Sequence, residues 1–283
     1  MRFLDGFSTL AADYDGFIVD LWGVVHDGVK PYPGSRRTLE ALRDAGKRVV
    51  LLSNAPRPSA TAQKALRGMG LGDDLYSGIM TSGEATRLAL INPPDAWFAT
   101  LGPRVLHIGP ERDRVTLAGL DYELVDIPEE ADFIVNTGPD EEISTTLEEY
   151  EAVLIASRRA GLKMICANPD LEVIRGGERL ICAGALAQRY EALGGDVRSF
   201  GKPDPAIYRP VLDLLGVEKH RVLAVGDALR TDIAGAHAAG VDSCWILGGI
   251  HAEALGGDPV LIKKAATDAG LAPVACLPAF NWT

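Results

Sequence analysis

Five polar side chains stand where apolar runs of strand length end. Asp20 follows FIV, and Ser53 and Asn54 follow VVLL. Lys202 and Asp227 each come one glycine after such a run, VRSF and VLAV respectively. Two carboxylates, a hydroxyl, an amide and an ammonium together suit an oxyanion such as phosphate, with a divalent cation between the carboxylates and the ligand. The residue types therefore predict a site for a phosphorylated ligand and a metal ion.

Apolar runs of strand length alternate with stretches of helical periodicity, which predicts an α/β fold with a mostly parallel sheet and helices on both faces. In such a sheet ligands bind at the carboxyl edge, where the five side chains are expected to meet. The expected strands are Phe17–Leu21, Val49–Leu52, Val105–Ile108, Phe133–Val135, Met164–Cys166, Val222–Val225 and Ser243–Leu247. The expected helices are Ser35–Ala45, Ser59–Met69, Thr146–Arg159, Ala185–Leu193, Ala206–Leu215 and Thr231–Ala239.

The middle of the chain differs in its sequence pattern from the two ends of the chain. It contains the proline-rich INPPD and the acidic DIPEEAD, which interrupt the pattern of strands and helices. We therefore expect a core domain built from residues 1–80 and 185–283, with residues 81–184 inserted as a second α/β unit. This division places VRSF in the core. The tail after Gly249 carries little signal, and it either covers the core or frays.

The composition is that of an ordinary globular protein, with 47% hydrophobic and 24% charged residues. The formal net charge is -11 and no basic cluster offsets it, which excludes nucleic acid and anionic membranes as expected partners. No apolar stretch is long enough for a membrane helix and no signal-peptide pattern is present, so we expect a cytoplasmic protein. The four cysteines are far apart without a CxxC pair, so neither a zinc site nor a disulfide framework is expected.

Four segments, in order DLWGV, LLSNA, GKPDP and GDALRTD, resemble the four motifs of the haloacid dehalogenase superfamily. The long insertion after the second motif, with SNAPR, NPD and AGALAQRYE, is similar to the class IIA subfamily of NagD-like and 4-nitrophenylphosphatase-like enzymes. The resemblance covers nearly the whole chain. It implies a Rossmann-like parallel core sheet, an inserted α/β type-2 cap domain, and a magnesium-dependent hydrolase acting on a small phosphorylated metabolite. Type-2 caps in similar proteins often take part in dimer contacts, so a homodimer is one expectation.

The resemblance implies a metal site and a nucleophile among four residues. Asp20 is implied to form an aspartyl-phosphate and to ligate Mg2+ together with Asp227 and the backbone carbonyl of Trp22. A carboxylate that attacks a phosphate dianion meets like-charge repulsion, which a cation offsets. Asp232 is implied to bind the metal through water or to orient Lys202.

The resemblance also implies which residues hold the substrate. Ser53 and Lys202 are implied to bind the phosphoryl oxygens, with Asn54 at the adjoining position. Asn168 and Asp170 of the inserted unit have two interpretations, a substrate-facing loop and an ordinary Asn-Pro turn.

Trp22 departs from the family pattern. Family phosphatases carry a second Asp at this position, which protonates the leaving alkoxide and then activates water. An indole can do neither, and losing a positioned acid-base group typically costs about 100- to 10,000-fold in rate. Three explanations are open: the reaction needs no such group, His26 or Asp27 supplies it, or the protein binds phosphorylated ligands without efficient turnover. For His26 and Asp27 the alternative is a solvated turn closed by Gly28.

An aromatic residue after the nucleophile also occurs in haloacid dehalogenases, where halide leaves without a proton. Hydrolysis of an ester or a carbon–halogen bond by Asp20 is therefore a further alternative. The complete GDALRTD motif argues against it, because a metal-free dehalogenase does not need those acids. If the enzyme is a phosphatase, substrates with good leaving groups are expected to react best.

Overall fold

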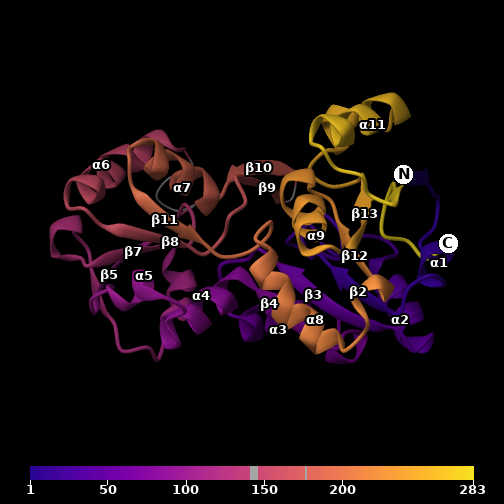
Figure 1. Ribbon diagram of the computed structural model, residues 1–283, viewed down its shortest axis with the longest axis horizontal. Helices are drawn as coiled ribbons and strands as arrows, with labels where there is room; N and C mark the ends of the chain where they lie inside the picture. The colour runs from indigo at the N-terminus through magenta and orange to yellow at the C-terminus, as the bar shows by residue number, and fades with distance from the viewer. Residues whose placement is uncertain (141–145, 176) are drawn as a thin grey trace.

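The computed structural model describes residues 1–140, 146–175 and 177–283, and within them it contains two parallel sheets and one hairpin. Each sheet forms the centre of its own lobe, and the two lobes lie side by side along the longest axis of the molecule (Figure 1). We call them the core lobe and the inserted lobe. None of the helices in these ranges is long and apolar enough to cross a membrane.

The core sheet consists of seven parallel strands in the order β1-β14-β13-β12-β2-β3-β4, as the described residues show. Its central strands are buried apolar runs, as expected for a sheet that is covered on both faces. The strands are β1 (Arg2–Phe3), β2 (Gly16–Val19), β3 (Arg48–Ser53), β4 (Gly78–Thr81), β12 (Val222–Gly226), β13 (Asp242–Ile246) and β14 (Ala275–Leu277).

Helices cover both faces of the core sheet. Successive residues of β2 point to opposite faces, so Phe17 packs with α2 and α3 while Ile18 packs with α8 and α9. Helices α10 and α11 cover the far end beside β13 and β14. The core helices are α1 (Ser8–Ala11), α2 (Ser35–Asp44), α3 (Ser59–Gly68), α8 (Tyr208–Leu215), α9 (Ala234–Ala239), α10 (Ala252–Leu255) and α11 (Pro259–Asp268).

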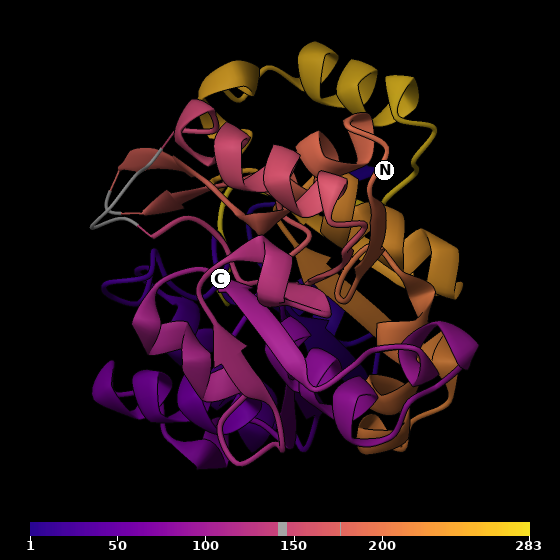
Figure 2. The same ribbon diagram turned by 90° about the vertical axis from the view of Figure 1, so that its left-hand side faces the viewer.

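The inserted sheet has five parallel strands in the order β11-β8-β7-β5-β6 among the described residues. Helices α6 and α7 lie side by side on one face (Figure 2), and α4 and α5 cover the other. The strands are β5 (Arg104–Ile108), β6 (Glu123–Val125), β7 (Phe133–Asn136), β8 (Lys163–Cys166) and β11 (Asp196–Ser199). The helices are α4 (Ser82–Ile91), α5 (Ala96–Ala99), α6 (Glu151–Arg159) and α7 (Ala183–Ala192).

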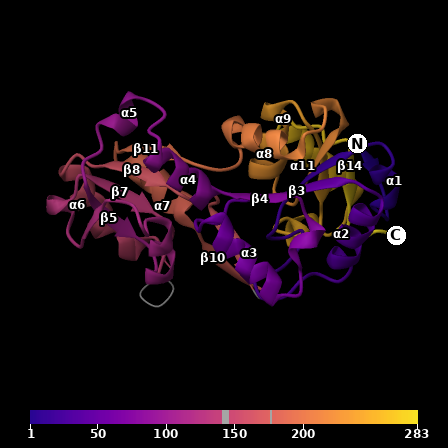
Figure 3. The same cartoon turned by 90° about the horizontal axis from the view of Figure 1, so that it is seen from below.

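An antiparallel hairpin, β9 (Glu172–Arg175) with β10 (Glu178–Ile181), extends from the inserted lobe toward the core lobe (Figure 1). Helix α4 lies at the junction of the two lobes (Figure 3). The carboxyl ends of β7 and β8 contribute Thr137, Gly138 and Asn168 to cavities that the core lobe also lines. The carboxyl edges of both sheets therefore face a common space.

The return of the chain to the core differs from the expected position. VRSF was expected to form a core strand, and this prediction is wrong, because β11 pairs with β8 in the inserted sheet. The expected boundary at residue 185 falls inside α7, whose residues pack in the hydrophobic cluster of the inserted lobe. The inserted sheet thus ends at Ser199, and Lys202 lies on the segment that returns to the core.

Candidate active site

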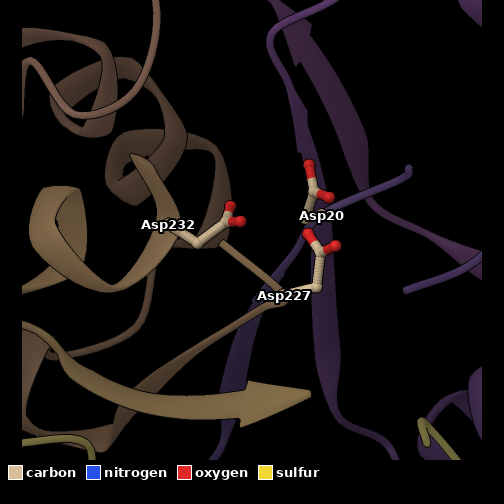
Figure 4. Close-up of side chains that lie close together, drawn as sticks. All are labelled: Asp20, Asp227 and Asp232. Atoms are coloured by element: carbon tan, nitrogen blue, oxygen red, sulfur yellow. The ribbon is translucent and has the colours of Figure 1, made fainter. Parts of the chain in front are cut away.

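Asp20 and Asp227 come from neighbouring strands. Asp20 directly follows β2 and Asp227 directly follows β12, and the register pairs Val19 with Val225. The Asp20 N–H donates to the carbonyl of Val225 over 2.9 Å, which holds the two strand ends side by side. Figure 4 shows the carboxylates of Asp20 and Asp227 close together, with Asp232 pointing toward them from the following helical turn.

Lys202 connects two of these carboxylates. Its Nζ donates to Asp20 Oδ1 over 2.5 Å and to Asp232 Oδ1 over 2.6 Å, and a third bond of 3.1 Å reaches the carbonyl of Leu52. Lys202 is 3% exposed and Asp20 is 7% exposed, so water screens these interactions weakly. The structure therefore brings together an ammonium and two carboxylates that are far apart in the sequence.

The loop after β13 positions the side chain of Asp227. Nothing in the sequence indicated that this loop belongs to the site. The backbone N–H of Ile250 donates to Asp227 Oδ2 over 2.7 Å, and Trp245 Nε1 donates to the Asp227 carbonyl over 2.8 Å. A Cβ at Gly249 would lie 1.9 Å from Asp227 Oδ2, and one at Gly23 would lie 2.1 Å from it. Both glycines are needed because any side chain there would collide with this carboxylate.

Among the described residues, the carboxylates of this site outnumber the ammonium groups that contact them. Oxygen atoms of Asp20, Asp227 and Asp232 all lie within 4.8 Å of one another, and Lys202 is the ammonium that contacts this group. Burial, reinforced by Asp232, raises the pKa of Asp227 to about 7. Burial also raises the pKa of Asp20 well above its usual range, although Lys202 opposes the shift. Buried carboxylate oxygens with excess negative charge are the donors that hard divalent cations prefer, so the residues present fit Mg2+.

Lys202 stays charged in this environment. Burial by itself would lower its pKa, but the carboxylates of Asp20 and Asp232 outweigh burial and hold the pKa well above its usual value. A permanently charged ammonium beside Asp20 suits the stabilisation of negative charge on a bound anion.

Ser53 and Asn54 lie at the end of β3, and both line the cavity that contains Asp20. The Ser53 hydroxyl accepts from the Ala55 N–H over 3.2 Å. The Asn54 amide donates to Asp170 Oδ1 (2.9 Å) and to the Lys202 carbonyl (3.0 Å), and its oxygen accepts from the Lys202 N–H (2.8 Å). The Asn54 side chain is therefore engaged by the protein itself while it lines the cavity, and its place among the phosphate-binding groups stays a prediction.

The loop of Asn168 to Asp170 has features of both interpretations, a turn held by Asn168 and a loop that faces the cavity. Asn168 Oδ1 accepts from the Asp170 N–H over 3.0 Å, as in an ordinary Asn turn, and both residues also line the Asp20 cavity. Arg230 of the core lobe donates to the carbonyl of Pro169. The loop of the inserted lobe is thus bonded to the core at two points, through Asn54 and Arg230.

Trp22 lines the Asp20 cavity, and its indole packs edge-on against the His26 ring at 5.4 Å between centroids. His26 Nδ1 accepts from the Gly28 N–H over 3.0 Å, and burial lowers the pKa of His26 to about 4. Asp27 Oδ1 accepts from the N–H groups of Val29 and Lys30, which closes a turn. Neither His26 nor Asp27 is among the described residues that line the Asp20 cavity. The placement of Asp27 favours the turn, whereas His26 is buried rather than solvated and lines a neighbouring cavity between the lobes.

The Asp20 cavity has a volume of about 160 Å³ and lies between the two lobes. Residues that sequence reasoning did not single out also line it, and they come from loops, from the hairpin and, for Arg57 and Thr231, from within the SNAPR and GDALRTD segments. They include Tyr32, Arg57, Glu172, Val173, Thr231 and Ile250.

Comparison with known proteins gives two matches to family models. Residues 17–123 match the model described as haloacid dehalogenase-like hydrolase, and residues 199–272 match one described as HAD-hydrolase-like. A crystal structure of a haloacid dehalogenase-like hydrolase from Brucella suis 1330 is 35% identical and superposes with a TM-score of 0.82, covering 98% of this chain and 99% of that chain.

Two phosphatases are also similar. Chronophin from Mus musculus is 29% identical over 252 residues, which cover 83% of this chain and 81% of chronophin. The p-nitrophenyl phosphatase from Archaeoglobus fulgidus is 26% identical with a TM-score of 0.70, covering 95% of this chain and 97% of that chain. These likenesses and the parallel sheets confirm the expected fold class.

Proposed function

Because the chain belongs to the haloacid dehalogenase-like hydrolase family, as its four motifs predicted, we propose that it is a magnesium-dependent phosphatase with Asp20 as the nucleophile. The relatives named as phosphatases support a hydrolase of phosphatase type. We propose further that its substrates are small phosphorylated molecules and that it has neither nucleic acid nor a membrane as a partner. We also propose that it forms a homodimer.

One arrangement carries the proposal. Lys202 lies within hydrogen-bond distance of Asp20 and Asp232, and Asp227 completes a cluster of carboxylates at the end of the core sheet. This cluster opens into a cavity that residues of the inserted lobe close, among them Asp170. A cavity with walls from both lobes limits the access of water and brings a substrate close to the carboxylate that reacts.

In the proposed reaction a carboxylate oxygen of Asp20 attacks the phosphorus atom, and the bond from phosphorus to the leaving oxygen breaks with its electron pair on that oxygen. Water then attacks the phosphorus of the aspartyl-phosphate, which restores Asp20 and releases phosphate. Lys202 reduces the repulsion between the carboxylate and the phosphate dianion, since its ammonium already contacts Asp20. Ser53, which lines the cavity, would contact phosphoryl oxygens with its hydroxyl.

Asp20, Asp227 and the carbonyl of Trp22 would hold Mg2+, and Asp232 orients Lys202 through their hydrogen bond. Bound there, Mg2+ supplies positive charge that polarises the phosphoryl group.

Phosphate release from 4-nitrophenyl phosphate and acetyl phosphate in the presence of Mg2+ tests the proposal. Asp20→Asn is expected to lower kcat by more than about 1,000-fold, because the nucleophile is lost. Asp5→Asn, which removes an exposed carboxylate, serves as the matched control and is expected to leave kcat unchanged. Circular dichroism of both variants checks that they fold. Turnover that survives in Asp20→Asn refutes the assignment of the nucleophile.

A second candidate function is a protein that binds phosphorylated ligands but turns them over poorly. Trp22 favours it, because an indole lines the cavity where family phosphatases carry an acid. In that case the native chain is silent on every ester, and Trp22→Asp gains phosphate release. Halide release from 2-haloacids in the presence of a chelator tests the carbon–halogen alternative, which the clustered carboxylates disfavour.

A further inference from the structure

A second cavity adjoins the one that contains Asp20, and His26 lines it. Its volume is about 300 Å³, against about 160 Å³ for the Asp20 cavity, and Trp22 and Val173 line both. Helix α3 and the hairpin strand β10, which contribute walls to the second cavity, lie at the junction between the lobes (Figure 3). A substrate with its phosphoryl group at Asp20 therefore has room in the second cavity for the rest of its leaving group.

One nitrogen of the His26 ring is engaged by the protein and the other is not. Nδ1 accepts from the Gly28 N–H over 3.0 Å, whereas no described residue bonds to Nε2, although His26 is only 5% exposed. Nε2 is not among the described polar atoms that are fully buried without a partner, so it retains access to the cavity that the ring lines. Polar groups of buried side chains nearly always have a partner, so this nitrogen points to an atom of a ligand in the second cavity.

The Gly28 N–H also determines which nitrogen of His26 carries the ring proton. A ring nitrogen that accepts a hydrogen bond carries no proton, so the proton of the neutral imidazole is on Nε2. Burial lowers the pKa of His26 to about 4, which keeps the ring neutral near physiological pH. His26 therefore presents an N–H that can donate a hydrogen bond, rather than an acidic proton or a base.

Gly28 and Trp22 hold the His26 ring in this orientation. Gly28 has a φ of +86°, and a Cβ there would lie 2.1 Å from Cη2 of Trp22. The absence of a side chain at Gly28 leaves room for the indole, which packs edge-on against the imidazole at 5.4 Å between centroids. The N–H is thus positioned before a ligand binds, which reduces the entropy lost on binding.

The structural contacts of His26 do not account for Nε2. An asparagine at this position could accept from the Gly28 N–H, and a phenylalanine could pack against Trp22, so neither contact requires a nitrogen at the far side of the ring. A donor at that position gains only from an acceptor that the described residues do not supply.

We propose that His26 determines substrate specificity, with Nε2–H donating a hydrogen bond to an oxygen of the leaving group in the second cavity. This inference rests on the proposed phosphatase function. The preferred substrates are then phosphate monoesters whose leaving group carries an ether, hydroxyl or carbonyl oxygen in addition to the ester oxygen. No covalent step is added: the bond between phosphorus and the ester oxygen breaks as in the proposed reaction, and the imidazole keeps its proton.

Pairs of esters that differ by one oxygen test the inference. In 4-(methoxymethyl)phenyl phosphate an oxygen replaces one methylene group of 4-propylphenyl phosphate, and the two phenols are leaving groups of similar strength. The 3-substituted pair places the same oxygen at a second position. We call the ratio of kcat/KM for the ether to kcat/KM for the propyl ester the oxygen preference. Aryl esters are chosen because a phenolate leaves without help from an acid.

Three variants separate the donor from the other contacts of the ring. His26→Asn keeps an acceptor for the Gly28 N–H but is too short to replace Nε2, and it is expected to lower the oxygen preference by about 3- to 10-fold in at least one pair, as one neutral hydrogen bond provides. The change is expected in the KM of the ether, because the hydrogen bond is the same in ground and transition states. His26→Gln places an amide N–H near the position of Nε2 and is expected to restore most of the preference. His220→Asn, which changes an exposed histidine that lines neither cavity, is the control and is expected to keep it.

A purely structural role of His26 would change both esters of a pair alike and leave the oxygen preference unaltered. An oxygen preference in His26→Asn that equals the native one in both pairs therefore overturns the inference, as does a His26→Gln variant that matches His26→Asn. If turnover of these esters still depends on Asp20, that result leaves the phosphatase proposal intact and removes only the inference. If no ester is hydrolysed, calorimetric affinities of the same esters for Asp20→Asn and for Asp20→Asn combined with His26→Asn make the same comparison. An equal ratio of affinities in these two proteins refutes the role of His26.

Discussion

Replacing Asn54 with alanine tests how the site is held in place. The Asn54 side chain makes four hydrogen bonds, which reach Asp170, both backbone groups of Lys202, and the Ser82 hydroxyl at 3.2 Å. Alanine leaves the N–H and C=O of Lys202 buried without these partners. Each orphaned buried group costs about 1–3 kcal/mol, so with partial relaxation we expect the free energy of unfolding to fall by about 2–4 kcal/mol.

The same change is expected to lower kcat, because the backbone of Lys202 determines where its ammonium meets Asp20. A loss of about 10- to 100-fold corresponds to a displacement of the order of 1 Å. Urea unfolding and phosphate release measure the two effects, with exposed Asn92→Ala as the control. Stability within about 0.5 kcal/mol of the native value together with an unchanged kcat refutes the reasoning.

Variants of Asp170 test the hydrogen bond between the lobes separately from the other hydrogen bonds of Asn54. Asp170→Asn retains an acceptor for the Asn54 amide, so it is expected to keep most of the activity, whereas Asp170→Ala removes the acceptor. In a double-mutant cycle Asn54→Ala and Asp170→Ala should couple by about 1 kcal/mol. Additive effects would mean that this hydrogen bond carries no energy.

Three further predictions concern the metal site and Trp22. Mg2+ at about 100 times its dissociation constant should raise the free energy of unfolding by about 2.7 kcal/mol, because only the folded chain clusters these carboxylates. An unfolding midpoint that stays the same when a chelator removes Mg2+ would count against the site. Trp22→Asp should raise kcat for alkyl phosphates by about 100-fold or more and change 4-nitrophenyl phosphate little; a uniform change in both would contradict a proton-donor role. Gly249→Ala should weaken the effect of Mg2+ on the free energy of unfolding, since its Cβ would lie 1.9 Å from Asp227 Oδ2. The control Gly68→Ala, whose Cβ meets nothing within 4 Å, should leave that effect unchanged. Equal responses of the two variants would argue that the close approach of the Gly249 backbone to Asp227 is unimportant.

Four of the site residues could be predicted from the sequence because they follow runs of buried strand residues: Asp20, Ser53, Asn54 and Asp227. Parallel strands end at the same edge, so Asp20 and Asp227 could be expected to meet although they are far apart in the sequence. The outcome depended on β2 and β12 being neighbours, which local patterns do not encode. The assignment of VRSF to the core sheet failed for the same reason, because the partner of a strand is fixed by packing over long range.

Other parts of the site left no trace in the sequence pattern. The bond from Ile250 to Asp227 comes from a backbone N–H, which every residue except proline possesses. The direction of His26, turned to the Gly28 N–H, could not be inferred from its nearness to Asp20 in sequence. Asn54 was placed at the right strand end, but its residue type suits a ligand contact and an internal hydrogen-bond network equally well.

The chain passes between the lobes at Thr81–Ser82 and again at Phe200–Lys202, and Asn54 bonds to both passages. If the inserted lobe rotated as a rigid body about these two passages, Lys202 would lie beside the axis of rotation. Displacement in such a rotation would grow with distance from these passages, so the ammonium of Lys202 would move less than the far end of the inserted sheet. Such a rotation would open the cavity while the contacts of Lys202 with Asp20 and Asp232 stay in place.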